Sequence, residues 1–176
     1  MIISVEKAKT LITFPDWTDE KIEMKLKAVE QTIRAYTNNN FQDRDYRRTA
    51  DIVGGLFIVE ALTPFDIGDT VQISESRLNK GLFTIASASD STFGVEEPVK
   101  DENDVLITKI VYPEDVVACC VNLLEWEVNN RGKVGIQSET LSRHSVTYFN
   151  MDGANQVMGY PASLLGCLKA YRKARC

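Results

Sequence analysis

Residues 18–38 carry an apolar stripe with the spacing of an α-helix. The stripe consists of Ile22, Leu26, Val29, Ile33 and Tyr36, which follow one another at intervals of four, three, four and three residues. This spacing places them on one face, and the charged residues between them, Glu30 included, are expected to face solvent. Asp16 or Thr18 can cap the start of the helix, and the asparagines at 38–40 can end it. A stripe of this length requires a second apolar surface to cover it.

A second apolar helix is expected after Pro113, and it supplies that surface. Proline favours the first turn of a helix, and the acidic residues that follow it suit the positive end of the helix dipole. The expected inner stripe is Val117, Cys120 (or Val121), Leu124 and Val128. Gly132 is expected to end the helix in a left-handed conformation.

Between these helices the pattern changes to short segments rich in β-branched and aromatic residues. The segments are 52–59, 69–74, 82–88, 92–97 and 105–112, and turn-forming residues separate them. Five strands at this spacing favour a small closed or half-closed β-barrel over an open sheet with exposed edges. We expect an inserted module whose ends lie close together, preceded by a charged, exposed connector over 41–50. Gly54 and Gly55 would lie within a strand and mark a bulge.

The predicted fold class is therefore α+β. A small helical bundle, formed by residues 1–50 and 113–176, carries an inserted five-stranded β-barrel-like module over 51–112. The bundle begins with a short helix over 4–11, capped by Ser4, and residues 145–149 form its best strand. It ends in a C-terminal helix or arm over 161–174, whose apolar residues are Leu164, Leu165, Leu168 and Tyr171.

Charge is unevenly distributed along the chain, whose net charge is −5. Residues 51–112 carry four Lys or Arg against eleven Asp or Glu, a net charge of −7, and would repel nucleic acid. No apolar run approaches the roughly 20 residues that span a bilayer, and the N-terminus lacks the order of a signal peptide. We therefore expect an intracellular protein whose four cysteines are reduced.

The sequence contains no pattern that indicates catalysis, a cofactor or a metal. His144 is the only histidine and has no cysteine or carboxylate at ligand spacing, and no Gly-x-Ser-x-Gly turn presents a nucleophile. Residues 101–105 resemble the start of a calcium loop but lack its later ligands. We expect a protein that is not an enzyme.

The basic C-terminal residues have two interpretations. Lys169, Arg172, Lys173 and Arg175 can simply be solvated cations near the negative end of a helix. Alternatively they form a docking arm for an acidic protein surface or a nucleic-acid contact. Tyr171 lies between the charges and favours an interface, because tyrosine anchors contacts at low entropic cost.

Three stretches of the chain resemble the head–tail connector, or adaptor, proteins of long-tailed bacteriophages. The first is AVEQTIRAYTNNNF, with which the opening pair of helices ends, and the second is the returning helix PEDVVACCVNLLEWEVNN. The third is the serine-rich SETLSRHSVTYF followed by GYPASLLGCLKAYRK. Together they cover roughly residues 1–46 and 113–175.

This resemblance implies a structural protein of the virion neck, assembled in the host cytoplasm. Such proteins form a ring on the portal after DNA packaging and meet a stopper or tail-completion protein on their other side. DNA would pass through the channel without specific binding, and the subunit could be a monomer in isolation. The resemblance places Leu168, Lys169, Tyr171, Arg172 and Lys173 at the portal interface.

The module at 51–112 departs from the simpler members of that family, and two alternatives stay open. One is another neck protein, of the tail-completion or tail-terminator type. The other is a nucleic-acid-binding module that uses the barrel as an OB-like platform. Its candidate base-stacking residues are Phe57, Phe65, Phe83 and Phe93.

Overall fold

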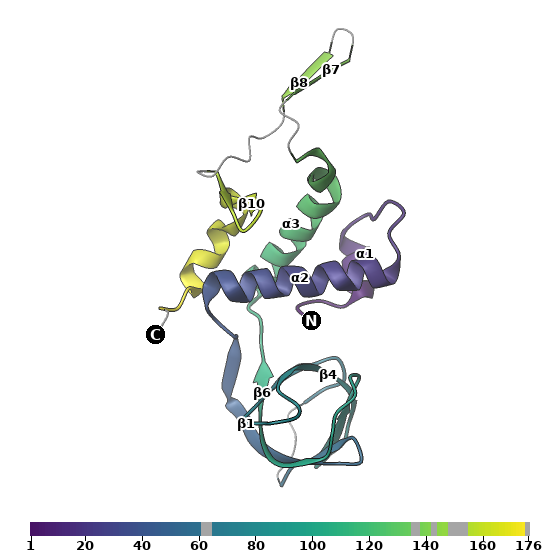
Figure 1. Cartoon of the computed structure of the whole chain (residues 1–176), viewed down its shortest axis with the longest axis vertical. Coiled ribbons are helices and arrows are strands. Elements are labelled where there is room, and N and C mark those ends of the chain that lie inside the picture. The colour runs from purple at the N-terminus through teal and green to yellow at the C-terminus, as the bar shows by residue number, and fades with distance from the viewer. Residues whose placement is uncertain (61–64, 135–137, 142–143, 148–154, 175–176) are drawn as a thin grey trace. The chain divides into compact units, whose positions relative to one another are not determined.

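The computed structural model describes residues 1–60, 65–134, 138–141, 144–147 and 155–174 of the chain. It has α+β architecture and divides into two compact units. One unit contains Met1 and Asn40–Tyr112 and is called the barrel unit; the other contains Ile2–Asn39 and Pro113–Cys176 and is called the helical unit. Several elements of each unit are labelled in Figure 1.

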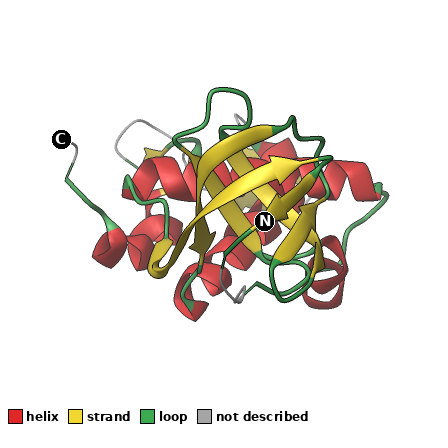
Figure 2. Cartoon of the chain, turned by 90° about the horizontal axis from the view of Figure 1, so that it is seen from below, coloured by secondary structure: helices red, strands yellow, loops and turns green. Residues whose placement is uncertain are grey.

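The barrel unit is a closed antiparallel barrel of six strands, not five. The strands are β1 (Gln42–Val53), β2 (Leu56–Ile58), β3 (Thr70–Ser74), β4 (Gly81–Ala88), β5 (Thr92–Val95) and β6 (Glu102–Ile110). Their order around the barrel is β1–β2–β5–β4–β3–β6, with β6 pairing back to β1. The strands are drawn in yellow in Figure 2.

The additional strand comes from β1, because the predicted connector at 41–50 belongs to the barrel wall. Asp43 pairs with Lys109 and Arg47 with Thr108, so residues 44–46 bulge out between two consecutive pairs. A bulge interrupts the alternation of inward and outward side chains, which removes the usual sequence signal of a strand. The barrel unit consequently begins at Asn40, where the sequence had indicated residue 51.

Gly54 and Gly55 form the turn between β1 and β2, so the predicted bulge inside one strand is wrong. Val53 pairs with Leu56, which leaves a two-residue hairpin loop. Both glycines have positive φ, 59° and 83°, as the turn that matches the twist of antiparallel strands requires. The predicted strand 52–59 is therefore two antiparallel strands.

The interior of the barrel is filled with aliphatic and aromatic side chains. Its buried residues are Ala50, Ile52, Phe57, Val59, Phe65, Val71, Ile73, Ile85, Phe93, Val105 and Ile107. Phe57 and Phe93 stack with their ring centroids 4.6 Å apart, and Phe65 meets Phe93 edge-on at 5.2 Å. The two ends of the insert lie next to each other, because the ring centroids of Phe41 and Tyr112 are 5.0 Å apart.

The helical unit is built on α2 (Asp19–Thr37), which packs against α3 (Glu114–Asn130). Ile22, Leu26, Val29 and Ile33 are all buried, as the stripe predicted, and Tyr36 is half-buried. Thr18 is the N-cap and Asn38 ends the helix in the left-handed conformation. The short helix α1 (Val5–Leu11) is capped by Ser4, as expected.

The buried face of α3 differs from the predicted stripe. Of the residues predicted, only Cys120 and Leu124 are buried; Val116, Cys119, Leu123 and Glu127 complete the face. The face is wider because α3 packs against both α2 and the C-terminal helix. Gly132 lies in a 3₁₀ turn, η1 (Arg131–Lys133), and does not adopt the left-handed conformation predicted for it.

The remaining elements of the helical unit are short. They are the hairpin β7 (Ser138–Leu141) and β8 (His144–Thr147), the pair β9 (Gln156–Val157) and β10 (Tyr160–Pro161), and the 3₁₀ helix η2 (Ala162–Tyr171). The last helix is thus a 3₁₀ helix and not the expected α-helix. In the described part of the chain, no helix combines the length and apolarity needed to cross a membrane.

Candidate partner interface

The C-terminal segment that the resemblance indicates is η2 together with residues 172–174, called here the arm. η2 packs against both α2 and α3 within the helical unit. Leu165 and Leu168 have no solvent exposure. Leu168 is therefore a core residue of the helical unit, and the surface available to a partner is formed by the remaining candidates.

Hydrogen bonds fix the end of the arm along the end of α2. The backbone N–H of Lys173 donates to the carbonyl oxygen of Thr37 at 2.8 Å. The side-chain amide of Asn38 donates to the carbonyl oxygen of Ala174 at 2.9 Å, and that of Asn39 to the carbonyl oxygen of Tyr171 at 3.3 Å. The asparagines that the sequence identified only as a helix stop also hold the arm.

Tyr171 joins the arm to the start of α3. Its hydroxyl lies 2.7 and 2.8 Å from the two carboxylate oxygens of Asp115 and donates a hydrogen bond to them. This hydrogen bond to Asp115 raises the pKa of the Tyr171 hydroxyl. Arg172 lies over the ring of Tyr36, 5.2 Å from its centroid, in a cation–π contact with α2.

The outer side of the arm is basic. The side chains of Lys169, Arg172 and Lys173 are exposed, whereas Tyr171 is half-buried. The arm therefore presents three cations to solvent. Its hydrogen bonds to α2 and α3 hold the segment in place. Such a surface suits electrostatic docking, because ordering the segment costs little at the moment of contact.

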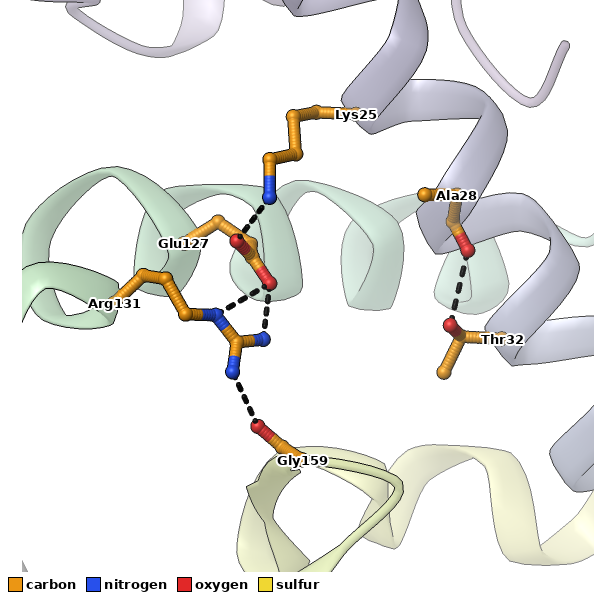
Figure 3. Close-up of polar contacts among 6 residues, drawn as sticks. All are labelled: Lys25, Ala28, Thr32, Glu127, Arg131 and Gly159. Carbon is orange, nitrogen blue, oxygen red and sulfur yellow. Dashed lines mark hydrogen bonds and ion pairs between the residues drawn. The ribbon is translucent and has the colours of Figure 1, made fainter. Parts of the chain in front are cut away.

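An ionic cluster around the buried Glu127 holds the residues just before the arm (Figure 3). Glu127 of α3 accepts hydrogen bonds from Lys25 at 3.0 Å and from Nε of Arg131 at 3.0 Å. Arg131 also forms an ion pair with Glu127 through its terminal nitrogen and donates to the carbonyl oxygen of Gly159 at 3.1 Å. Burial alone would raise the pKa of Glu127, but hydrogen bonds from Arg131, Lys25 and Tyr160 outweigh it and lower the pKa to about 2.

Two aromatic rings complete this cluster. The guanidinium of Arg131 lies 4.7 Å from the ring centroid of Trp126 and 5.1 Å from that of Tyr160. The two rings are themselves 5.4 Å apart. Because Tyr160 directly precedes the arm, the cluster sets the point at which the arm begins. The Glu127–Arg131 spacing of four was visible in the sequence, but its burial was not.

Residues 101–105, which resemble the start of a calcium loop, lie at the start of β6, and carboxylates among them bind other turns of the barrel. Asp101 accepts a hydrogen bond from the N–H of Gly54 at 2.8 Å. Glu102 accepts from the hydroxyl of Ser76 at 2.6 Å and from the N–H of Arg77 at 2.7 Å. These bonds, with that from Ser76 the largest, lower the pKa of Glu102 to about 2. Within the described ranges, no three His, Cys, Asp or Glu residues are placed to hold a metal ion.

The proposed base-stacking residues are not available on the surface of the barrel. Phe57, Phe65 and Phe93 are buried in its interior, and Phe83 is half-buried against the same core. Stacking of a base on a ring requires an exposed face. The aromatic residues therefore give no support to the nucleic-acid-binding alternative.

His144, the only histidine in the sequence, lies in β8.

The chain matches no model of a known protein family, and no curated protein matches it. The residues and their chemistry therefore carry the functional argument.

Proposed function

We propose that this chain is a structural protein of the bacteriophage neck. In the proposal it forms a ring on the portal after DNA packaging, at the head–tail junction of the virion, and joins the head to tail components. The observation that carries the proposal is the arm, which is bonded to α2 through its backbone and to α3 through the side chain of Tyr171, while Lys169, Arg172 and Lys173 face solvent. The sequence resemblance assigns portal contact to the same segment.

The arm contributes to docking in two ways. Its cations attract an acidic portal surface and raise the rate of encounter. Its bonds to Thr37, Asn38 and Asp115 hold it in place before the partner arrives, so that less conformational entropy is lost on binding. Tyr171 links the arm to α3 through its hydrogen bond to Asp115.

In the proposal the barrel unit supplies a second protein-binding surface. Residues 51–112 have a net charge of −7, which suits contact with a stopper or tail-completion protein. DNA would pass such a surface without binding, because like charges repel. The proposal needs no enzyme activity, cofactor, metal or membrane.

Charge reversal on the arm tests the proposal. The variant Lys169→Glu/Arg172→Glu/Lys173→Glu is mixed with portal rings from the same phage, and docking is measured by sedimentation and negative-stain electron microscopy. We expect rings on the portal for the unmodified chain and at least a tenfold loss of docking for the variant. The matched control, Lys7→Glu/Lys80→Glu/Lys100→Glu, reverses three exposed cations elsewhere and should dock normally.

Three outcomes would contradict the proposal. Equal docking of the arm variant and the control would remove the arm from the interface. Particles that ignore the portal altogether would favour the tail-completion or tail-terminator alternative, which is then tested by mixing with tail tubes. Binding of single-stranded DNA that weakens steeply with salt would instead favour the nucleic-acid alternative.

A further inference from the structure

Two cysteine thiols from different elements meet beside the arm. Cys119 lies on α3 and is buried, while Cys167 lies on η2 and is exposed. Both thiols donate to the same acceptor, the carbonyl oxygen of Leu164, each at 3.4 Å. A shared acceptor places the two sulfur atoms on the same side of η2.

The two thiols also interact with each other. Burial raises the pKa of the Cys119 thiol, and the neighbouring Cys167 thiol raises it further, which agrees with the proximity that the shared acceptor indicates. Cys120 is adjacent to Cys119 in the sequence and is also buried, but consecutive residues of a helix point in different directions. The contact is therefore specific to one of the two neighbouring cysteines.

We propose that Cys119 and Cys167 form a disulfide bond when the protein meets a disulfide oxidant such as glutathione disulfide. The bond would link η2 covalently to α3 and so fix the arm. The timing rests on the proposed function: disulfides are rare in a reducing cytoplasm, where the subunit would assemble, and form once the particle reaches an oxidising medium. The bond would then secure a junction that was reversible during assembly.

The reaction balances in two exchange steps. The thiolate of exposed Cys167 attacks one sulfur of glutathione disulfide, forms a mixed disulfide and releases one glutathione thiolate. The thiolate of Cys119 then attacks the Cys167 sulfur, which forms the Cys119–Cys167 bond and releases the second glutathione. The two cysteines lose two electrons and two protons, and glutathione disulfide is reduced to two thiols.

The second step is expected to be the slow one. Burial, together with the neighbouring Cys167 thiol, raises the pKa of the Cys119 thiol, so little thiolate is present at neutral pH. At pH values below the pKa, the fraction of thiolate increases about tenfold for each unit by which the pH rises. The mixed disulfide on Cys167 should therefore accumulate first and resolve faster as the pH rises.

The test treats the purified full-length chain with glutathione disulfide and follows it by mass spectrometry and peptide mapping. We expect the loss of two hydrogens and a crosslink between the tryptic peptides that contain Cys119 and Cys167. The bond should raise the melting temperature of the helical unit by about 5–10 °C, and dithiothreitol should reverse this rise. Cys119→Ser should stop the reaction at the glutathione adduct of Cys167.

Cys120→Ala is the matched control, because it removes the neighbouring buried thiol and should leave crosslinking intact. Three results would overturn the inference: no crosslink, a stable glutathione adduct in the unmodified chain, or a crosslink through Cys120 or Cys176. The reaction is measured without the portal. A failure to form the bond is therefore distinguishable from a failure of the chain to dock.

Discussion

The ammonium group of Lys25 on α2 lies 3.0 Å from the carboxylate of Glu127 on α3. The side chain of Glu127 is only 3% exposed, so the acidic partner of this ion pair is almost completely buried. Burial of the Glu127 carboxylate costs desolvation free energy, but its hydrogen bonds outweigh that cost, as its lowered pKa indicates, and loss of one partner of such a pair is costly. The pair therefore specifies how α2 and α3 align and also strengthens their contact.

Glu127→Ala is expected to destabilise the helical unit by about 3–5 kcal/mol, because it leaves Lys25 and Arg131 without their shared carboxylate. Denaturant unfolding followed by tryptophan fluorescence measures this, since Trp17 and Trp126 both belong to the helical unit. The control is Glu23→Ala, which breaks the exposed ion pair with Lys27 and should cost about 0.5 kcal/mol or less. Equal losses for the two variants would contradict the structural role of Glu127.

The stability of the helical unit should fall in acid because of the same carboxylate. The pKa of Glu127 is 4.5 when unperturbed and about 2 in the folded chain. As the pH falls from 4.5 to 2, the unfolded chain takes up this proton first, so the unfolded state is favoured by about 1.4 kcal/mol per pH unit. Tryptophan fluorescence separates this effect from that of Glu102 in the barrel unit. Glu127→Gln should flatten the dependence, and an unchanged slope would refute the assignment.

Gly55→Val should destabilise the barrel by about 1–2 kcal/mol, because a β-branched residue is strained at the observed φ of 83°. Gly55→Asn is the control, since asparagine tolerates the left-handed region, and it should cost clearly less. Amide hydrogen exchange in β1 and β2 reports the difference. Equal protection in both variants would mean that the turn does not have the described conformation.

Phe93→Ala should destabilise the barrel by about 3–5 kcal/mol, because Phe93 contacts both Phe57 and Phe65 in the interior. Leu78→Ala is the comparison, since Leu78 is 56% exposed and its truncation should change stability by about 0.5 kcal/mol or less. Thermal unfolding followed by far-ultraviolet circular dichroism measures both. A Phe93 variant as stable as the unmodified chain would place this ring outside the core.

Much of the framework was predictable because it follows local periodicity. The stripe from Ile22 to Ile33, the cap at Thr18 and the α+β class all come from neighbouring residues. The β1 strand was missed because the bulge at 44–46 breaks the alternation of side chains. The Gly54–Gly55 turn was assigned to a strand interior because glycine has a role in both settings.

Long-range contacts account for the other differences. Glu30 was expected in solvent but is only 5% exposed, and the buried Glu127 is bonded to Lys25, which lies 102 positions away in the sequence. The bonds of Asn38 and Asn39 to the arm connect residues more than a hundred positions apart. No pattern in one segment contains that information, so the placement of Leu168 in the core could not be predicted either.

The contact between Phe41 and Tyr112 means that the barrel is inserted between two neighbouring points of the chain. The chain enters and leaves the barrel at adjoining residues, and the N–H of Val111 donates to the carbonyl oxygen of Phe41 at 3.0 Å. Replacing the whole insert by a short linker would therefore ask the helical unit to close only a small gap, which costs little entropy. The same geometry lets an unrelated domain with adjacent termini be grafted at this point. Evolution of the chain can thus exchange the inserted surface while the helical unit remains unchanged.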